Sequence, residues 1–257
     1  MQSRPYSYLF SISYFGARFK GWAPQPGQAT IQGRLEKVLR FFLGHADFSI
    51  LGSSRTDAGV SCRLGFAQLF LREKVELEKL LPELNRHLGG EIRLNSVREV
   101  PREFNLIQSV ERKTYRYFFS DSVEMHPFAS AYLTQVFEIN SLAQMEENAA
   151  LFLGKHDFKA FCTPSPNKSD FEREVLSAKV YLTEEFRGEF FPKRVYCFEV
   201  TGTGFLHHQV RKMVNAIWHL SPEEIQARLE KSEEPWETVP TAPANGLVLW
   251  ETVLRNL

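Results

Sequence analysis

The chain has 257 residues, of which 43% are hydrophobic and 13% aromatic, enough to form the core of one large domain or two small ones. Basic and acidic residues each number 31, so the whole chain lacks the positive excess typical of nucleic-acid-binding proteins. The three cysteines are widely spaced without a Cys-x-x-Cys motif, which excludes a zinc-finger framework and indicates a reducing compartment. No signal peptide or membrane span is visible, so we expect a soluble, cytoplasmic protein that contacts no membrane.

Apolar periodicity predicts the elements of the first half of the chain. Alternation predicts strands at residues 6–14, 48–51, 65–71 and 92–100. Helical spacing predicts helices at residues 31–42, capped by Thr30, and 76–88. Pro82 would kink the second helix or mark its true start.

The second half of the chain shows a similar mixture of predicted strands and helices. Strands are predicted at residues 114–119, 175–183, 195–201 and 247–253, with 175–183 and 195–201 as hairpin partners, and helices after Ser141, at 205–219 and from Pro222. A loop is expected at 154–170. These patterns favour a mixed α/β fold of the α+β type with a largely antiparallel sheet, divided near residue 105 into subdomains 1–105 and 106–257.

One carboxylate, Asp57, lies in the segment 52–62, Gly-Ser-Ser-Arg-Thr-Asp-Ala-Gly-Val-Ser-Cys, between two predicted strands. Gly52 and Gly59 favour a tight turn that would aim the short Asp side chain. Arg55 could keep this carboxylate ionised by charge and hydrogen bonding. Asp57 is therefore a candidate nucleophile or general base, and the alternative is an Asx-turn beside a surface arginine.

The segment Arg112-Lys113-Thr114-Tyr115-Arg116-Tyr117 combines aromatic and basic residues. On a strand, Tyr115 and Tyr117 share one face, and Thr114 and Arg116 share the other. An aromatic ring among cations suits a nucleobase and its phosphate. The alternative is a structural, half-buried tyrosine with solvated charges beside it.

Gly202-Thr203-Gly204 leads into the helix predicted at 205–219, which would place Arg211 in its second turn. No Gly-Lys-Ser/Thr follows, so a P-loop is excluded. His207 and His208 are adjacent, so on a helix they would point apart without the spacing of a metal pair, and we assign neither to a metal. Arg211 is either a surface cation or a partner of the Asp57 carboxylate.

Six blocks, in this order, resemble the tRNA pseudouridine synthase A family over nearly the whole chain. They are Tyr14-Phe15-Gly16 with Gly21-Trp22 and Thr30-Ile31-Gln32; Arg55-Thr56-Asp57-Ala58-Gly59-Val60; Lys113-Thr114-Tyr115-Arg116-Tyr117; His156-Asp157-Phe158 with Phe161; Gly204-Phe205-Leu206 with Val210-Arg211; and Ala242-Pro243-Ala244 with Gly246-Leu247.

The resemblance implies an isomerase that converts uridine to pseudouridine at positions 38 to 40 of the tRNA anticodon stem-loop. It implies Asp57 as nucleophile, Tyr115 as the ring that stacks on the target base, Arg55 as part of the motif loop and Arg211 as the basic residue that pairs with the carboxylate. It also implies the pseudouridine synthase fold, with two similar α/β halves whose sheets join, and a homodimer without cofactor or metal. Whether the carboxylate attacks C1′ or assists loss of the 2′ proton stays open.

The sequence departs from the family pattern at three places. Ile107 stands where an Arg is common, Ser61 where a His is usual, and Asn215-Ala216 where a Gly-Thr-like pair is usual. A paralogue with altered tRNA positions and a non-catalytic RNA-binding protein are therefore alternatives. A hydrolase would need a second acid, for which Asp157 is the candidate, and would release free uracil.

Overall fold

The structure is a computed structural model that describes residues 4–164, 169–230 and 238–255. Two compact units make up the chain, one from residues 1–111 with 249–257 and the other from residues 112–248. The boundary expected near residue 105 stays a prediction. No helix in the described ranges is long and apolar enough to cross a membrane.

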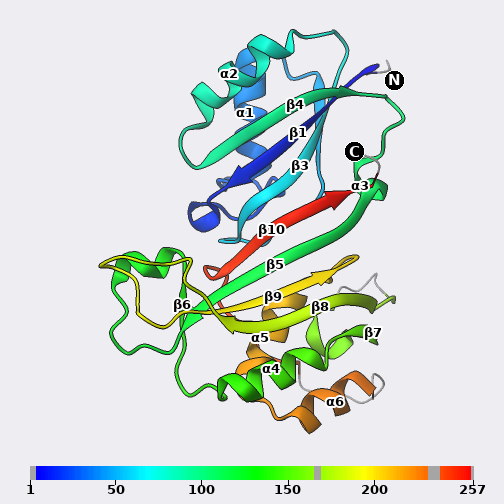
Figure 1. The fold of residues 1–257 in the computed structure, drawn as a ribbon. Coiled ribbons are helices and arrows are strands. Elements are labelled where there is room, and N and C mark those ends of the chain that lie inside the picture. Colours follow the sequence, from blue (N-terminus) through cyan, green and yellow to red (C-terminus); the bar gives the residue numbers. More distant parts are fainter. Residues whose placement is uncertain (1–3, 165–168, 231–237, 256–257) are drawn as a thin grey trace. The chain divides into compact units, whose positions relative to one another are not determined.

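The first unit is an antiparallel sheet with two long helices on one face (Figure 1). Its strand order is β4-β1-β3 with β10 next to β3, and β2 also pairs with β3. Apolar side chains of β1, β3 and β4 line a small cavity together with side chains of α1 and α2, so these helices cover that face. The elements are β1 (Tyr6–Tyr14), η1 (Gly16–Arg18), α1 (Ile31–Leu43), β2 (Phe48–Gly52), β3 (Ser61–Leu71), α2 (Leu77–Leu88), β4 (Ile92–Val100), α3 (Leu106–Ser109) and β10 (Leu247–Leu254).

The second unit has the strand order β5-β9-β8-β7, and the short β6 pairs with β5. Trp218 of α5 packs edge-on against Tyr117 and Phe119 of β5, which places α5 on one face of this sheet. Asn148 of α4 donates to the carbonyl oxygen of Leu220 and joins α4 to the end of α5. The elements are β5 (Val110–Ser120), η2 (Pro127–Ala131), β6 (Thr134–Gln135), α4 (Leu142–Ala150), β7 (Gly154–Asp157), η3 (Lys159–Phe161), β8 (Glu172–Leu182), β9 (Tyr196–Gly202), α5 (Gln209–His219) and α6 (Pro222–Glu230).

The two halves of the chain share an order of main elements. β1-α1-β2-β3-α2-β4 and β5-α4-β8-β9-α5-β10 both run strand, helix, two antiparallel strands, helix, strand. The predicted fold class, an α/β fold of the α+β type with largely antiparallel strands and flanking helices, is confirmed. The predicted hairpin is confirmed as β8 and β9, and the predicted caps hold: Thr30 accepts from the Gly33 amide and Ser141 from the Gln144 amide.

Two local predictions were wrong, and one of the two alternatives for Pro82 is excluded. Residues 154–157 form the edge strand β7, and η3 follows it, in place of an unbroken loop; residues 165–168 of that predicted loop lie outside the described residues. Pro82 lies inside α2, so it does not mark the start of this helix, and the alternative that it kinks the helix stays a prediction. Helix α5 begins at Gln209, four residues later than predicted, because His208 has a left-handed backbone with φ of 61° that no helix interior adopts.

Candidate active site

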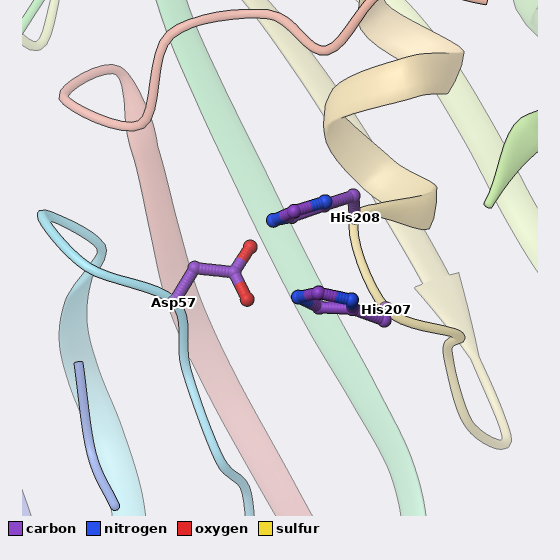
Figure 2. A group of neighbouring side chains, drawn as sticks. All are labelled: Asp57, His207 and His208. Carbon is purple, nitrogen blue, oxygen red and sulfur yellow. The ribbon is translucent and has the colours of Figure 1, made fainter. Parts of the chain in front are cut away.

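Asp57 lies in a tight turn on the loop between β2 and β3, as Figure 2 shows. The amide of Val60 donates to the carbonyl oxygen of Asp57 at 3.2 Å, and Gly59 has a φ of 82°, which glycine adopts without steric cost. The Asp57 side chain is half-buried. The predicted turn around this carboxylate is therefore confirmed.

A second loop, residues 15–30, clamps the Asp57 loop from the side. The Trp22 amide donates to the carbonyl oxygen of Thr56 at 3.0 Å, and the Gly59 amide donates to that of Phe19 at 3.0 Å. The buried Thr56 hydroxyl also shares a hydrogen bond of 2.8 Å with the hydroxyl of Tyr14. Side chain and backbone of the residue before Asp57 are thus both held, which fixes the direction of the carboxylate.

Glycines allow this close approach of the two loops. A Cβ atom at Gly16 would collide with the carbonyl group of Val60, and one at Gly52 would collide with the Trp22 ring. At Gly21 it would lie 2.8 Å from the Thr56 carbonyl oxygen, and φ there is 94°. The sequence blocks around Gly16, Gly21 and Trp22 are therefore parts of one scaffold for the Asp57 turn.

Arg55 does not hold the Asp57 carboxylate in this structure. Its side chain is exposed, and within the described residues it makes no hydrogen bond or ion pair. An exposed guanidinium two residues from the carboxylate is suited to contact a ligand in the solvent. The expectation that Arg55 keeps Asp57 ionised by direct bonding is not supported.

In the second unit, the two tyrosines of β5 differ in their surroundings. Tyr117 is fully buried, and its hydroxyl donates to the carbonyl oxygen of Pro243 at 2.7 Å. Burial raises the pKa of Tyr117, so it stays a neutral structural group. Tyr115 is half-buried, with its ring edge-on to Phe205 at 5.2 Å between centroids. Tyr115 is therefore the tyrosine of this motif whose ring suits a ligand.

Lys113 belongs to the same face of β5 as Tyr115, two residues away. Burial lowers the pKa of Lys113 to about 8, far below that of an ordinary lysine. Such a shift marks a candidate functional residue. The sequence pattern did not single out Lys113, because a lysine on an alternating strand is usually a solvated charge.

Arg211 lies in the first turn of α5, because the helix starts later than predicted. Its Nε donates to the carbonyl oxygen of Ala242 at 2.7 Å, while the Ala242 amide donates to the Arg211 carbonyl oxygen at 3.3 Å. The guanidinium is half-buried and held by the segment that leads into β10. These contacts join the Ala242-Pro243-Ala244 segment to Arg211.

His207 and His208 precede α5, as Figure 2 shows, and the argument that they point apart on a helix was wrong. Their rings stack with centroids 3.7 Å apart, and His208 Nδ1 is hydrogen-bonded to the Thr163 hydroxyl at 2.9 Å. The assignment of neither histidine to a metal stays a prediction.

The residues that depart from the family pattern lie in different surroundings. The Ser61 hydroxyl accepts a hydrogen bond from the Gly16 amide at 2.9 Å and so belongs to the loop clamp. Ile107 is 51% exposed in the first turn of α3, and Asn215 is half-buried within α5. Asp157, the candidate second acid of a hydrolase, accepts a hydrogen bond from the Lys159 amide at 2.7 Å, beside the start of η3.

Comparisons with known proteins give one consistent match. The model of the tRNA pseudouridine synthase family matches residues 149–253. The tRNA pseudouridine synthase A 2 of Bacillus anthracis is 34% identical, with 82% of each chain covered. The tRNA pseudouridine synthase A of Bacillus sp. (strain KSM-64) is 31% identical over 95% of this chain and 97% of its own. That of Lysinibacillus sphaericus (strain C3-41) is 30% identical, covering 93% and 95%. The chain therefore belongs to the tRNA pseudouridine synthase A family.

Proposed function

We propose that this protein isomerises uridine to pseudouridine at positions 38 to 40 of the tRNA anticodon stem-loop, with Asp57 as the nucleophile. The clamped turn that presents Asp57 carries the proposal. It places one aimed carboxylate in the motif Arg55-Thr56-Asp57-Ala58-Gly59-Val60 of a chain that belongs to this family. The relatives' names support tRNA as the substrate class.

The reaction matches what a single fixed carboxylate can do. The bond from ribose C1′ to N1 breaks, the uracil turns over, and C5 joins C1′, so nothing is oxidised or hydrolysed. The carboxylate either attacks C1′ or assists loss of the 2′ proton, and both routes start from ionised Asp57. The target nucleotide must leave its stack first, because C1′ and C5 are otherwise out of reach. We expect no cofactor or metal.

The other residues take supporting roles in this proposal. Tyr115 stacks on the detached uracil and prevents its loss to water, because a uracil has an aromatic face that a tyrosine ring can cover. Arg211 supplies the positive charge that keeps the catalytic carboxylate ionised. Arg55, which is exposed, contacts the RNA backbone near the target. We also propose a homodimer that acts in the cytoplasm, where its tRNA substrate is found.

Tritium release from tRNA labelled at uridine C5 tests the assignment, because isomerisation must replace the hydrogen at C5. We expect release by the native chain, and a loss of at least about three orders of magnitude in Asp57→Ala and Asp57→Asn. Asp157→Ala is the matched control, since the Asp157 carboxylate accepts a local hydrogen bond from the Lys159 amide. A tRNA with cytidine at positions 38 to 40 should release no tritium.

Three other outcomes would contradict the proposal. Binding of tRNA without release by the native chain would favour a non-catalytic RNA-binding protein. Release of free uracil would favour a hydrolase. Tritium release that persists with cytidine at positions 38 to 40 would show that the modified uridines lie elsewhere in the tRNA, while the proposed reaction would still hold.

A further inference from the structure

The first unit has a sheet face that α1 and α2 do not cover. Phe10 faces these helices, so its neighbours Leu9 and Ser11 on β1 face the other way. One end of this second face is closed by residues 101–109, where Leu106 packs against Leu9 and the Gln68 amide donates to the Phe104 carbonyl oxygen at 2.9 Å. We call the face that carries Leu9, Ser11 and Ser13 the open face.

Four exposed arginines are arranged on and around the open face: Arg63, Arg93, Arg98 and Arg102. In the β1–β4 pairing, Arg93 lies opposite Ser13 and Arg98 lies opposite Leu9, which places both on this face. Arg93 and Arg98 are five residues apart on β4, or about 17 Å. The open face therefore presents positive charge along the length of one strand.

The other two arginines lie over aromatic rings of the same unit. The Arg63 guanidinium lies 4.8 Å from the centre of the Trp250 ring and donates to the Trp250 carbonyl oxygen at 3.3 Å. The Arg102 guanidinium lies 4.7 Å from the centre of the Phe70 ring, and Phe70 is paired with Ser7 of β1. Each ring orders a cation that is exposed on its other side.

These arginines are not neutralised by carboxylates. Across the described parts of the chain, none of the four forms an ion pair, whereas three acidic residues of this unit pair with other cations. Glu99 pairs with Lys74, Glu91 with Arg18, and Asp47 with Arg4 and Arg72. Glu103 is an exposed acid next to Arg102 and reduces the field at that end. The excess of positive charge is therefore greatest toward Arg93 and Arg63.

We propose that the open face binds the sugar-phosphate backbone of tRNA, as a contact additional to the one at the target uridine. Unpaired arginines spaced along a strand suit a chain of phosphates, and Trp250 adds an aromatic surface beside Arg63. Arg63 follows Asp57 by six residues on the strand that leaves the catalytic loop, so RNA held there remains near the proposed site. This inference rests on the proposed function for the identity of the nucleic acid.

A second copy of the chain is a less suitable occupant of this face. In a two-fold interface the same surface meets itself, so arginine would face arginine without a carboxylate to compensate. The charge thus favours a polyanion.

The salt dependence of tRNA binding tests the proposal. We compare the native chain with Arg93→Ala/Arg98→Ala and with the control Arg40→Ala/Arg86→Ala, which removes the same charge from the helices α1 and α2. Loss of two phosphate contacts should lower the slope of log Kd against log salt by between about 1.4 and 1.8. The control should keep the native slope. Trp250→Ala should weaken binding with little change of slope, since it removes stacking and not charge.

An equal slope in the native chain and Arg93→Ala/Arg98→Ala would overturn the proposal. So would sedimentation that shows Arg93→Glu/Arg98→Glu losing self-association while its tRNA slope is native, because a second copy would then occupy the face. Circular dichroism and thermal unfolding check that each variant folds. Tritium release by the native chain is measured separately. The proposal that the open face binds tRNA and the proposal that the protein is an isomerase can therefore be contradicted independently of each other.

Discussion

At the scale of single residues, glycines set how closely the two loops of the proposed active site approach. Gly16 has no space for a side chain, because a Cβ there would collide with the backbone of Val60, and backbone cannot rotate away. We predict that Gly16→Ala lowers the free energy of unfolding by about 1–3 kcal/mol and reduces tritium release, since the Asp57 turn must shift.

Gly90→Ala is the matched control for this substitution, because a Cβ atom at Gly90 would have no other atom within 4 Å and the φ of this residue is not positive. Urea unfolding measures stability, and tritium release measures activity. If Gly16→Ala kept native stability and activity, the two loops would be able to move apart and accommodate a Cβ atom, which would contradict the prediction.

The motif of the proposed active site was recognisable from the sequence, but the contacts that support it were not. Asp57 stands out because its motif is contiguous and specific. Gly16, Trp22 and Ser61 reach the same turn from elsewhere in the chain, and periodicity carries no signal for such contacts. Arg55 shows the opposite error, because proximity in sequence suggested a pairing that the exposed side chain does not make.

At the scale of elements, the strands β5, β8 and β9 are joined by a charged network on one face. Glu199 of β9 accepts from Arg116 of β5 at 2.6 Å and pairs with Lys179 of β8 at 3.0 Å. Burial would raise the pKa of Glu199, but the hydrogen bonds from Lys179 and Arg116 outweigh it and hold this pKa below its usual range. Ionised Glu199 is therefore favoured by folding.

This shift predicts a pH dependence of stability. The contribution of Glu199 is present above its unfolded pKa, about 4.3, and is lost as the pH falls through the lower folded value. Glu199→Gln should therefore be less stable than the native chain at pH 7, and the difference should shrink below about pH 4. Urea unfolding at both pH values measures it. Glu172→Gln, which loses an exposed pair with Lys155, should change stability little at either pH.

Long elements with clear apolar patterns were predicted correctly, and the short polar strand β7 and the exact start of α5 were missed. The alternating residues of β1 and the Thr30 cap before α1 made these two elements predictable from the sequence. β7 is four residues long and polar, and it exists because it pairs with β8 at the sheet edge. The start of α5 depends on the left-handed backbone of His208, which no local pattern signals. The sequence pattern therefore does not predict short elements that form only through tertiary pairing.

At the scale of the whole molecule, the neutral net charge hides an uneven distribution. Among the residues that the structure describes, four exposed arginines that form no ion pair lie on and around one sheet face of the first unit, while Asp47, Glu91 and Glu99 pair with other cations. Only the register of β1 and β4 reveals that Arg93 and Arg98 share a face, and register is a tertiary property. A total charge of zero is thus compatible with an RNA-binding surface.

The chain path also connects the stability of the first unit to the end of the sequence. Leu254, in the last strand, packs with Leu9, Val100 and Leu106, so this core is complete only after the chain has passed through the second unit. We predict that Leu254→Ala costs about 2–4 kcal/mol of unfolding free energy, because it opens a cavity in that core. Leu176→Ala, at a side chain that is 48% exposed, should cost much less.

The accessibility of the cysteines to alkylation shows which unit loses stability in Leu254→Ala. Cys62 lies in the first unit and Cys197 in the second, and burial raises the pKa of each thiol to about 12, so both resist alkylation while folded. In Leu254→Ala, alkylation followed by mass spectrometry should show faster labelling of Cys62 than of Cys197, because opening of the first unit becomes easier. An equal increase in the labelling rate of both thiols would mean that the two units open together. Leu254→Ala would then destabilise the chain as one cooperative structure.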